Sequence, residues 1–314
     1  MKKVRIMSKI EEIASVHLGK AGDGSVVKPY ITPDAVDSTL LVGIPRHLNR
    51  TQYNIDDNAL PFVGSDTWNC YEFSTLADNG FPVNGVVRIV YSSSSPNIVE
   101  SKSLKLYLNS YNMQKCGDNY CDVVDFIENN ITDDLIKALG TSDVMVAFLT
   151  DSFAARPPVV NVFETIEDEV DPFELTFDHY NEDPGILNII KHDDNVNNFY
   201  HSAALRSNCR VTNQPDWGDV YIMISGKNQA TPESLLQYIV SMRKENHFHE
   251  EICECIYKRL RDLLGPSELL VACLYTRRGG IDINPVRATS QEVINRWACN
   301  LTSVHTLNEK TLRQ

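Results

Sequence analysis

A cysteine and an aspartate lie close together in one polar segment of the chain. Cys209 stands next to Arg210, and Asp216 follows seven residues after the cysteine, beside Trp217. A thiolate is a good nucleophile, and a cation such as Arg206 or Arg210 favours this form of a thiol. Burial against an indole favours the protonated form of a carboxyl group. A cysteine that attacks and an aspartic acid that donates a proton would suit addition to a carbon–nitrogen multiple bond.

The same residues also have a structural interpretation. An isolated cysteine is most often a small buried hydrophobic residue, and the run Pro215–Gly218 is typical of a turn that leads into a strand. Ser202–Leu205 and Val220–Ser225 have the composition of strands. The segment between them is therefore a polar connection of the kind on which sites are commonly built. Residue spacing by itself favours the structural interpretation.

Four ordered motifs resemble those of the QueF-type nitrile reductases, in the long form of this family that has two modules. The motifs are Val99–Ser110, Ser207–Cys209 with Gln214–Gly218, Phe248–Glu250 and Tyr275–Pro285. The resemblance extends from about Leu40 to Arg287. Members of this family use NADPH to convert 7-cyano-7-deazaguanine to 7-aminomethyl-7-deazaguanine on the route to queuosine, a modified tRNA nucleoside. The resemblance therefore implies nitrile reduction through a thioimidate on cysteine, with NADPH as the cofactor.

The resemblance also implies a role for each residue of the motifs. Cys209 attacks the nitrile carbon, Asp216 protonates the nitrogen, and His249 helps to relay a proton. Two carboxylates accept hydrogen bonds from the ring N–H and the exocyclic amine of the base, whose binding residues are Val99, Glu100, Ser101, Phe248, His249 and Glu250. No Gly-x-Gly-x-x-Gly motif of a Rossmann domain follows a strand, so cations and loop amides must hold the dinucleotide. The NADPH-binding residues are Ser101, Lys102, Arg277, Arg278 and Gly279.

Other interpretations stay open at this point. Glu100 and Glu250 stand near the starts of predicted helices, where a carboxylate also stabilises free backbone amide groups. An amidinotransferase-like enzyme would use the same thioimidate with an amine in place of hydride, and a non-catalytic deazapurine-binding module would form no adduct. No metal site is predicted, because the pairs His247/His249 and Cys253/Cys255 are two residues apart and would point to different sides of a helix.

The composition indicates which kind of ligand the protein binds and in which cellular compartment it acts. The chain has 314 residues and a formal net charge of −13, which argues against nucleic-acid binding because that activity needs a basic face. A small neutral heterocycle is the expected ligand. No N-terminal apolar run or stretch of membrane-spanning length is found, and the eight cysteines are scattered without a disulfide framework. We therefore expect a cytoplasmic protein with reduced thiols and no membrane contact. The resemblance implies a homodimer.

The hydrophobic pattern predicts an α+β fold in which two halves repeat one order of elements. In the first half, Thr67–Thr75 and Val86–Tyr91 predict strands, Ser101–Asn112 and Asp122–Leu139 predict helices, and Val144–Thr150 predicts a strand. In the second half, Leu205–Thr212 and Val220–Ser225 predict strands, Pro232–Arg243 and His249–Leu264 predict helices, and Leu269–Thr276 predicts a strand.

The resemblance implies that each half is a tunnelling-fold (T-fold) module, an antiparallel sheet with paired helices packed on one face. We expect a lead-in segment at 1–60, the N-terminal module at 61–163, a joining region at 164–200, the C-terminal module with the cysteine and the aspartate at 201–287, and a tail at 288–314. The acidic, proline-containing stretch around the joining region has weaker strand patterns at Val159–Phe163 and Phe173–Asp178.

Overall fold

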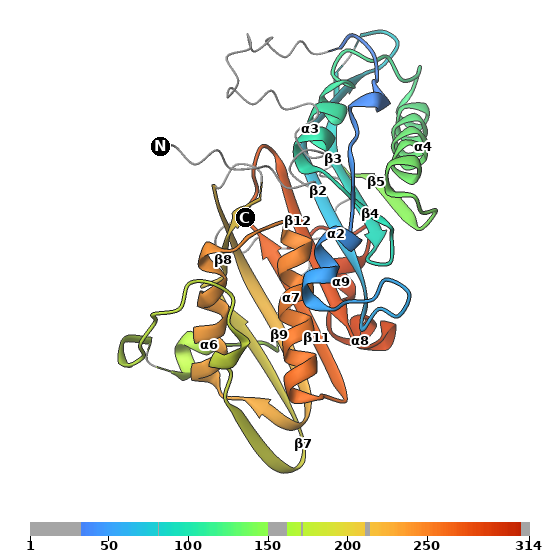
Figure 1. Ribbon diagram of the computed structural model, residues 1–314. Helices are drawn as coiled ribbons and strands as arrows, with labels where there is room; N and C mark the ends of the chain where they lie inside the picture. The colour runs from blue at the N-terminus through green and yellow to red at the C-terminus, as the bar shows by residue number, and fades with distance from the viewer. Residues whose placement is uncertain (1–32, 81, 150–161, 171, 211–213, 309–314) are drawn as a thin grey trace, which may run out of the picture.

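The computed structural model describes residues 33–80, 82–149, 162–170, 172–210 and 214–308. Its centre is an antiparallel sheet that runs through both halves of the chain (Figure 1). The strands, in spatial order, are β7 (Ile189–Ser202), β9 (Pro215–Ala230), β11 (Glu268–Tyr275), β12 (Ile281–Ala288), β2 (Val63–Leu76), β3 (Pro82–Ser92) and β5 (Val144–Leu149). The predicted α+β class with antiparallel pairing is therefore confirmed.

One strand pair joins the two halves into a single sheet. β12 pairs with β2 from Ile281 opposite Cys70 to Ala288 opposite Val63. The sequence analysis assigned no strand to the segment of β12, which contains Pro285, a residue type that is unusual in a central strand. The pairing of β12 with β11 covers only Val286–Ala288. Pro285 lies just outside this paired segment, so its missing N–H removes no hydrogen bond of the β11–β12 ladder.

Two pairs of helices cover one face of the sheet. They are α3 (Ser101–Asn109) with α4 (Tyr120–Leu139), and α6 (Pro232–Ser241) with α7 (His249–Leu264). α7 has the predicted bounds and ends at Gly265, whose left-handed backbone (φ 57°) suits glycine. Thr231 caps α6, as its sequence pattern indicates. The cap of α3 is Glu100, whose side chain accepts from the Ser103 amide, and the helix ends at Asn109, three residues before its predicted end.

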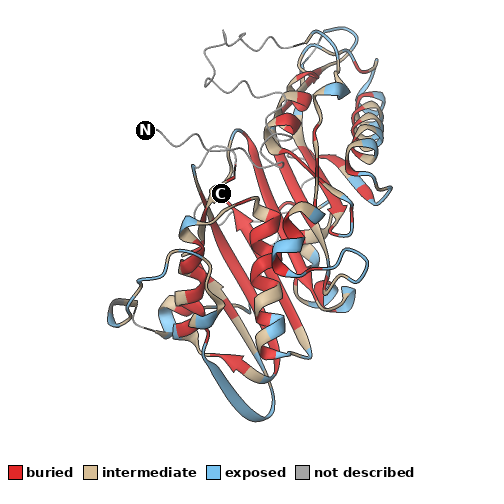
Figure 2. Ribbon diagram, in the orientation of Figure 1, coloured by how far each residue is buried: buried red, intermediate tan, exposed pale blue. Residues whose placement is uncertain are grey.

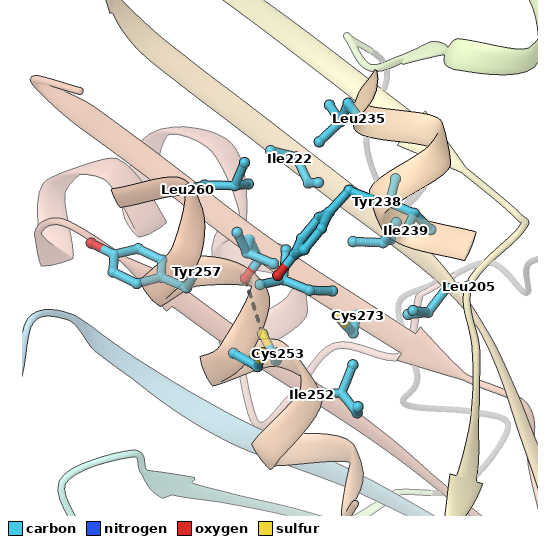
Figure 3. Packing of buried hydrophobic residues seen from close by; sticks show 14 of the residues in the cluster. Leu205, Ile222, Leu235, Tyr238, Ile239, Ile252, Cys253, Tyr257, Leu260 and Cys273 are labelled. Atoms are coloured by element: carbon cyan, nitrogen blue, oxygen red, sulfur yellow. Dashed lines mark hydrogen bonds between the residues drawn. The ribbon is translucent and has the colours of Figure 1, made fainter. Parts of the chain in front are cut away.

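The helices bury apolar residues at helical spacing against the sheet. In α4 the fully buried positions are Val123, Ile127, Ile131, Leu135 and Leu139, which recur every four residues. Figure 3 shows the corresponding core under α6 and α7, where Tyr238 and Ile252 pack with Ile222 and Cys273 of the sheet. Figure 2 shows that burial is concentrated in the sheet and on the inner side of α7.

The predicted tail folds onto the opposite face of the sheet. It forms α8 (Gln291–Trp297) and α9 (Cys299–Thr302). Val293, Ile294 and Leu301 of this segment pack with Tyr221 and Leu270 of the sheet. Tyr221 and Leu270 point to the face opposite α7, because neighbouring residues along a strand point to opposite faces. The alternation of side chains along a strand thus gives the sheet two buried faces.

The joining region and the lead-in differ most from the predictions. All but the last two residues of β7 lie inside the predicted joining region, which also holds β6 (Glu164–Thr165) and α5 (Ile166–Glu169). The strand expected at Phe173–Asp178 is wrong, since Pro172–Glu174 forms a 3-10 turn. Most of the strand expected at Val159–Phe163 lies outside the described residues. No helix in the described ranges is both long and apolar enough to cross a bilayer.

The described part of the lead-in, residues 33–60, is built into the fold. β1 (Gly43–Pro45) pairs with β4 (Asn97–Val99), and α2 (His47–Arg50) follows at once. Arg46 and Arg50 are both buried, with 5% and 1% of their surface exposed. The lead-in therefore supplies buried charges to the core, a role that its sequence did not indicate.

Candidate active site

A short hairpin positions the two predicted catalytic residues. β8 (Arg206–Cys209) pairs with the start of β9, with Ser207 opposite Asp216, and the Cys209 amide donates to the carbonyl of Gln214 at 2.8 Å. Residues that are directly opposite in an antiparallel pair, and residues two apart on one strand, point to the same face. Cys209 and Asp216 therefore project to the same side of the hairpin. β10 (Asn246–His247) runs parallel to β8 and brings the start of α7 to this side.

These elements enclose a cavity of about 220 Å³. Cys209 is only partly buried and lines this cavity together with Asp216, so the thiol is not enclosed in the apolar core. Of the predicted site residues, all but Glu100 and Arg277 line it. The full lining is Trp68, Val99, Ser101, Lys102, Lys105, Cys209, Gln214, Asp216, His247, Phe248, His249, Glu250, Arg278, Gly279, Ile281 and Ile283.

The cation beside the nucleophile is a lysine rather than one of the neighbouring arginines. Lys102 Nζ lies 3.6 Å from Cys209 Sγ. The guanidinium of Arg206 lies over Trp217, 5.6 Å from the ring centroid. Arg210 Nη2 donates to Asn49 Oδ1 at 2.8 Å and is thus directed away from the thiol. The expectation for Arg206 and Arg210 is therefore wrong, and Lys102 is placed to balance the charge of a thiolate.

Polar groups rather than an indole surround the carboxyl group of Asp216. Its Oδ1 lies 3.0 Å from Arg278 Nη1, and its Oδ2 lies 3.4 Å from His249 Nε2. The expected contact with Trp217 does not form, because adjacent residues of a strand point to opposite faces. The His249 ring stacks on Tyr275 at 3.8 Å between centroids and an interplanar angle of 6°, which fixes the imidazole beside the carboxyl group.

Glu250 is a buried acid with an unused acceptor. Only 2% of the residue is exposed, and its Oε1 has no hydrogen-bond partner within the described part of the chain. Burial, together with the negative charge of Asp66, raises the pKa of Glu250 to about 8. The structural role considered for Glu250 is taken by Glu251, whose Oε2 accepts from the Phe248 amide at 2.9 Å. Glu250 is therefore free to bind a ligand.

Glu100, in contrast, supports the start of a helix. Its Oε2 accepts from the Ser103 amide at 2.8 Å, and its Oε1 lies 3.7 Å from Lys102 Nζ. Ser101 Oγ also donates to Oε1 at 3.4 Å. The carboxylate is buried and does not line the cavity, so in this structure it orients Ser101 and Lys102, which do.

A cationic group of residues suited to a dinucleotide surrounds the cavity. Lys102, Lys105 and Arg278 line it, and Gly279 has a left-handed backbone (φ 55°) in the tight turn after β11. A Cβ atom at Gly279 would lie 2.9 Å from Lys105 Nζ, so a side chain would crowd this cation. Cations and an open glycine turn fit the phosphates of NADPH. Arg277 points elsewhere, with its guanidinium 3.2 Å from the centroid of the Tyr71 ring.

Several lining residues were not assigned a role from the sequence. Lys105 carried a usable signal, because residues three apart on a helix are neighbours and Lys102 had been assigned. His247 had been weighed only as a metal ligand, but it accepts or donates hydrogen bonds with Tyr53, Arg210 and Glu251. Gln214, Ile281 and Ile283 lie within the motifs but were assigned no role, and Trp68 lies outside the motifs. Within the described residues no group of three His, Cys, Asp or Glu side chains is arranged to hold a metal ion.

A buried ion cluster lies behind the cavity. It consists of Arg46, Arg50, Asp66, Glu254 and Arg287. Glu254 Oε1 lies 2.8 Å from Arg50 Nη2 and 3.1 Å from Arg287 Nη2, and Asp66 Oδ1 lies 2.8 Å from Arg287 Nη1. Glu254 follows Glu250 by one turn of α7, and Asp66 precedes Trp68 by two residues of β2, so the cluster continues the cavity wall. It ties the lead-in to both halves of the sheet.

Comparison with known proteins gives concordant matches. Residues 32–148 match the family model described as nitrile reductase, 7-cyano-7-deazaguanine-reductase N-term, and residues 215–293 match that of the QueF-like protein. The NADPH-dependent 7-cyano-7-deazaguanine reductase of Chromohalobacter salexigens is 37% identical over 260 residues, which cover 83% of this chain and 89% of that protein. The enzyme of the same name from Colwellia psychrerythraea is 38% identical over 284 residues, 90% of this chain and 94% of that protein.

The solved structure of the apo form of the archaeosine synthase QueF-Like is a more distant match. It is 16% identical and covers 31% of this chain and 95% of that one, with a TM-score of 0.27. This value is too low for the likeness to bear on the fold or the activity.

Proposed function

Because the chain belongs to the family of the NADPH-dependent 7-cyano-7-deazaguanine reductases, we propose that it reduces the nitrile of 7-cyano-7-deazaguanine to an aminomethyl group. NADPH is the cofactor, and the product, 7-aminomethyl-7-deazaguanine, serves queuosine synthesis. The observation that supports this most directly is the cavity shared by Cys209 and Asp216, in which a lysine ammonium lies 3.6 Å from the thiol sulfur.

The chemistry begins with a covalent adduct. The thiolate of Cys209 attacks the nitrile carbon, one π bond of the carbon–nitrogen triple bond breaks, and the nitrogen takes a proton from Asp216. The result is a thioimidate in which the base is attached to sulfur. His249, 3.4 Å from Asp216, can return a proton to the carboxylate, and Arg278, 3.0 Å away, holds the carboxylate in position. Lys102 Nζ, 3.6 Å from the sulfur, is placed to balance the negative charge of the attacking group.

The cofactor residues follow from the cationic lining of the cavity. Bound NADPH supplies hydride, and two molecules are needed in turn because the change from nitrile to amine takes four electrons. Lys102, Lys105 and Arg278 would hold the phosphates, and Gly279 leaves room for them. Glu250 has to retain the partly reduced base while the cofactor is exchanged.

The larger organisation is also part of the proposal. The repeat of antiparallel strands with two helices in each half supports two tandem T-fold modules, the first at 61–163 and the second at 201–287, to which β7 (Ile189–Ser202) is added because it pairs with β9. We propose that the protein acts as a cytoplasmic homodimer on a free base, without direct contact with nucleic acid. The formal net charge of −13 supports the last point.

The test is to mix the protein with 7-cyano-7-deazaguanine and measure its intact mass. We expect one added base per chain, loss of this adduct when NADPH is added, and oxidation of two NADPH per base. An adduct without NADPH oxidation would instead indicate an amidinotransferase-like enzyme. Binding of the base without any adduct would indicate a non-catalytic module, and either result would contradict the proposed reduction.

We expect the affinity for 7-deazaguanine, which lacks the nitrile, to rise with pH up to about 8. The pKa of Glu250 is raised to about 8, so below this pH the free protein carries a mostly neutral Glu250. Only the carboxylate accepts from both N–H groups of the base, so binding requires loss of the proton. Affinity should therefore rise about tenfold per pH unit below 8 and level off above it. Calorimetric titration at several pH values measures this.

The control for this titration is Glu250→Gln. The amide cannot ionise, so its weaker binding should not change with pH over the same range. A pH-independent affinity of the unmodified protein would show that the protonation of Glu250 is not linked to binding.

A further inference from the structure

The cavity contains buried polar atoms that lack partners. Trp68 Nε1, His249 Nδ1 and Glu250 Oε1 are buried and have no hydrogen-bond partner among the residues that the structure describes, and all three residues line the cavity. Buried polar groups of native proteins are nearly always hydrogen-bonded. Three such atoms around one cavity therefore indicate that a ligand supplies the missing partners.

The position of Trp68 is fixed by its neighbours. It is 1% exposed, and its ring stacks on Tyr91 at 6.5 Å between centroids. In the sheet it stands opposite Ile283, which also lines the cavity. The pKa of Tyr91 is raised mainly by its burial and next by the negative charge of Glu250. Glu250 therefore lies near the stacked rings of Trp68 and Tyr91. The indole and the buried acid thus share one end of the cavity.

We propose that Trp68 donates a hydrogen bond to the 6-oxo group of the substrate and thereby selects deazaguanine-type bases over 6-amino bases. The inference rests on the proposed function. An indole N–H can only donate and a carboxylate can only accept. The lactam edge of a deazaguanine presents an acceptor, the carbonyl oxygen, next to a donor, the ring N–H. Trp68 Nε1 and Glu250 Oε1 are complementary to this edge.

A 6-amino base reverses both groups. Its exocyclic amine would face the indole N–H, and its ring nitrogen, which carries no hydrogen, would face the carboxylate whenever Glu250 is ionised. When two donors or two acceptors face each other in a buried site, both lose their hydrogen bonds to water and gain none in return. The loss of binding free energy exceeds that for a missing methylene group, so such a site discriminates strongly between the two kinds of base.

The test is the variant Trp68→Phe, which retains an aromatic ring against Tyr91 and removes only the N–H donor and part of the ring. We expect its Kd for 7-deazaguanine in calorimetric titration to rise about 10- to 100-fold, because the carbonyl oxygen of the base loses its partner in a buried place. The matched control is Trp297→Phe. Trp297 Nε1 is also buried without a partner among the described residues, but the side chain packs on Phe199 outside the cavity. Its substitution should leave the affinity unchanged.

A second ligand separates contact with the base from an effect through Glu250. The analogue 6-thio-7-deazaguanine keeps the ring N–H and the exocyclic amine but has sulfur, a weaker acceptor, in place of the oxygen. We expect Trp68→Phe to change its Kd by less than about threefold, since little of this hydrogen bond is present to lose. An equal loss of affinity for both ligands would mean that Trp68 acts through Glu250 and would overturn the proposal. An unchanged Kd of Trp68→Phe for 7-deazaguanine would overturn it as well.

The unmodified protein provides a measurement that does not depend on the folding of a variant. It should bind the oxo base at least about tenfold more tightly than the thio base, and equal affinities would overturn the inference. If the unmodified protein binds neither base, the proposed function itself fails. If it binds 7-deazaguanine and forms the adduct with the cyano base, but Trp68→Phe behaves in the same way, only the inference about Trp68 fails.

Discussion

Cys209→Ala is expected to lower the rate of nitrile reduction by at least about 10³-fold, because the reaction loses its nucleophile. The increase in mass and the ultraviolet band of the thioimidate should disappear with it. The affinity for 7-deazaguanine should change by only a fewfold, since the residues proposed to hold the base, Glu250 and Trp68, are retained in this variant. NADPH oxidation, intact mass and calorimetric titration measure the three quantities.

The matched control is Cys121→Ala. Cys121 is an exposed cysteine of α4 that does not line the cavity, so its loss should leave the rate and the adduct unchanged. Reduction by Cys209→Ala at a rate near that of the unmodified protein would rule out the covalent route. Loss of base binding in Cys209→Ala would instead show that the cysteine helps to shape the cavity, and the rate alone would then not identify it as the nucleophile.

The sequence could identify most members of the site but not their contacts. Cys209, Asp216, His249 and Glu250 lie in recognisable motifs, and all four line one cavity. The cation at the thiol, however, is Lys102, which is 107 residues away along the chain. Its approach depends on the tertiary fold, which places the first turn of α3 and the end of β8 on the same cavity. Neighbours in sequence were misleading, because strand alternation directs Trp217 away from Asp216.

For the fold, too, the sequence predicted some elements and not others. α7 and α4 were predictable, because apolar residues recur at helical spacing and a glycine in the left-handed conformation ends each helix. β7 was missed because its first half, Ile189–Asn195, is exposed and mostly polar, and its pairing with β9 is not visible in a local pattern. β12 was also not predicted, and it contains Pro285, which is atypical of a central strand. Strands such as β7 and β12 are stabilised by pairing with strands that are distant in the sequence. A local hydrophobic pattern does not predict such strands.

The buried ion cluster shows how such distant contacts determine stability. Arg46, Arg50 and Arg287 come from the lead-in and from β12, and their buried partners are Asp66 and Glu254. Each side chain of these five residues is at most 3% exposed. Removing charges of this kind from water costs several kcal/mol for each ion, which the mutual attraction offsets only while every partner is present. Loss of one carboxylate therefore leaves three buried guanidinium groups with too little negative charge to offset their loss of hydration.

Glu254→Gln is accordingly expected to destabilise the protein by about 3–5 kcal/mol, because Arg50 and Arg287 lose their shared partner while staying buried. Thermal unfolding should show a fall in melting temperature on the order of 10 °C. The control is Glu268→Gln, which breaks an ion pair with Arg296 whose side chains are 34% and 42% exposed. Solvent screens such a pair, so its loss should cost at most about 1 kcal/mol. Equal small shifts for both variants would mean that the cluster adds no more than a surface pair. A large shift for Glu254→Gln alone means that the lead-in, through Arg50, is held in the fold by buried charge.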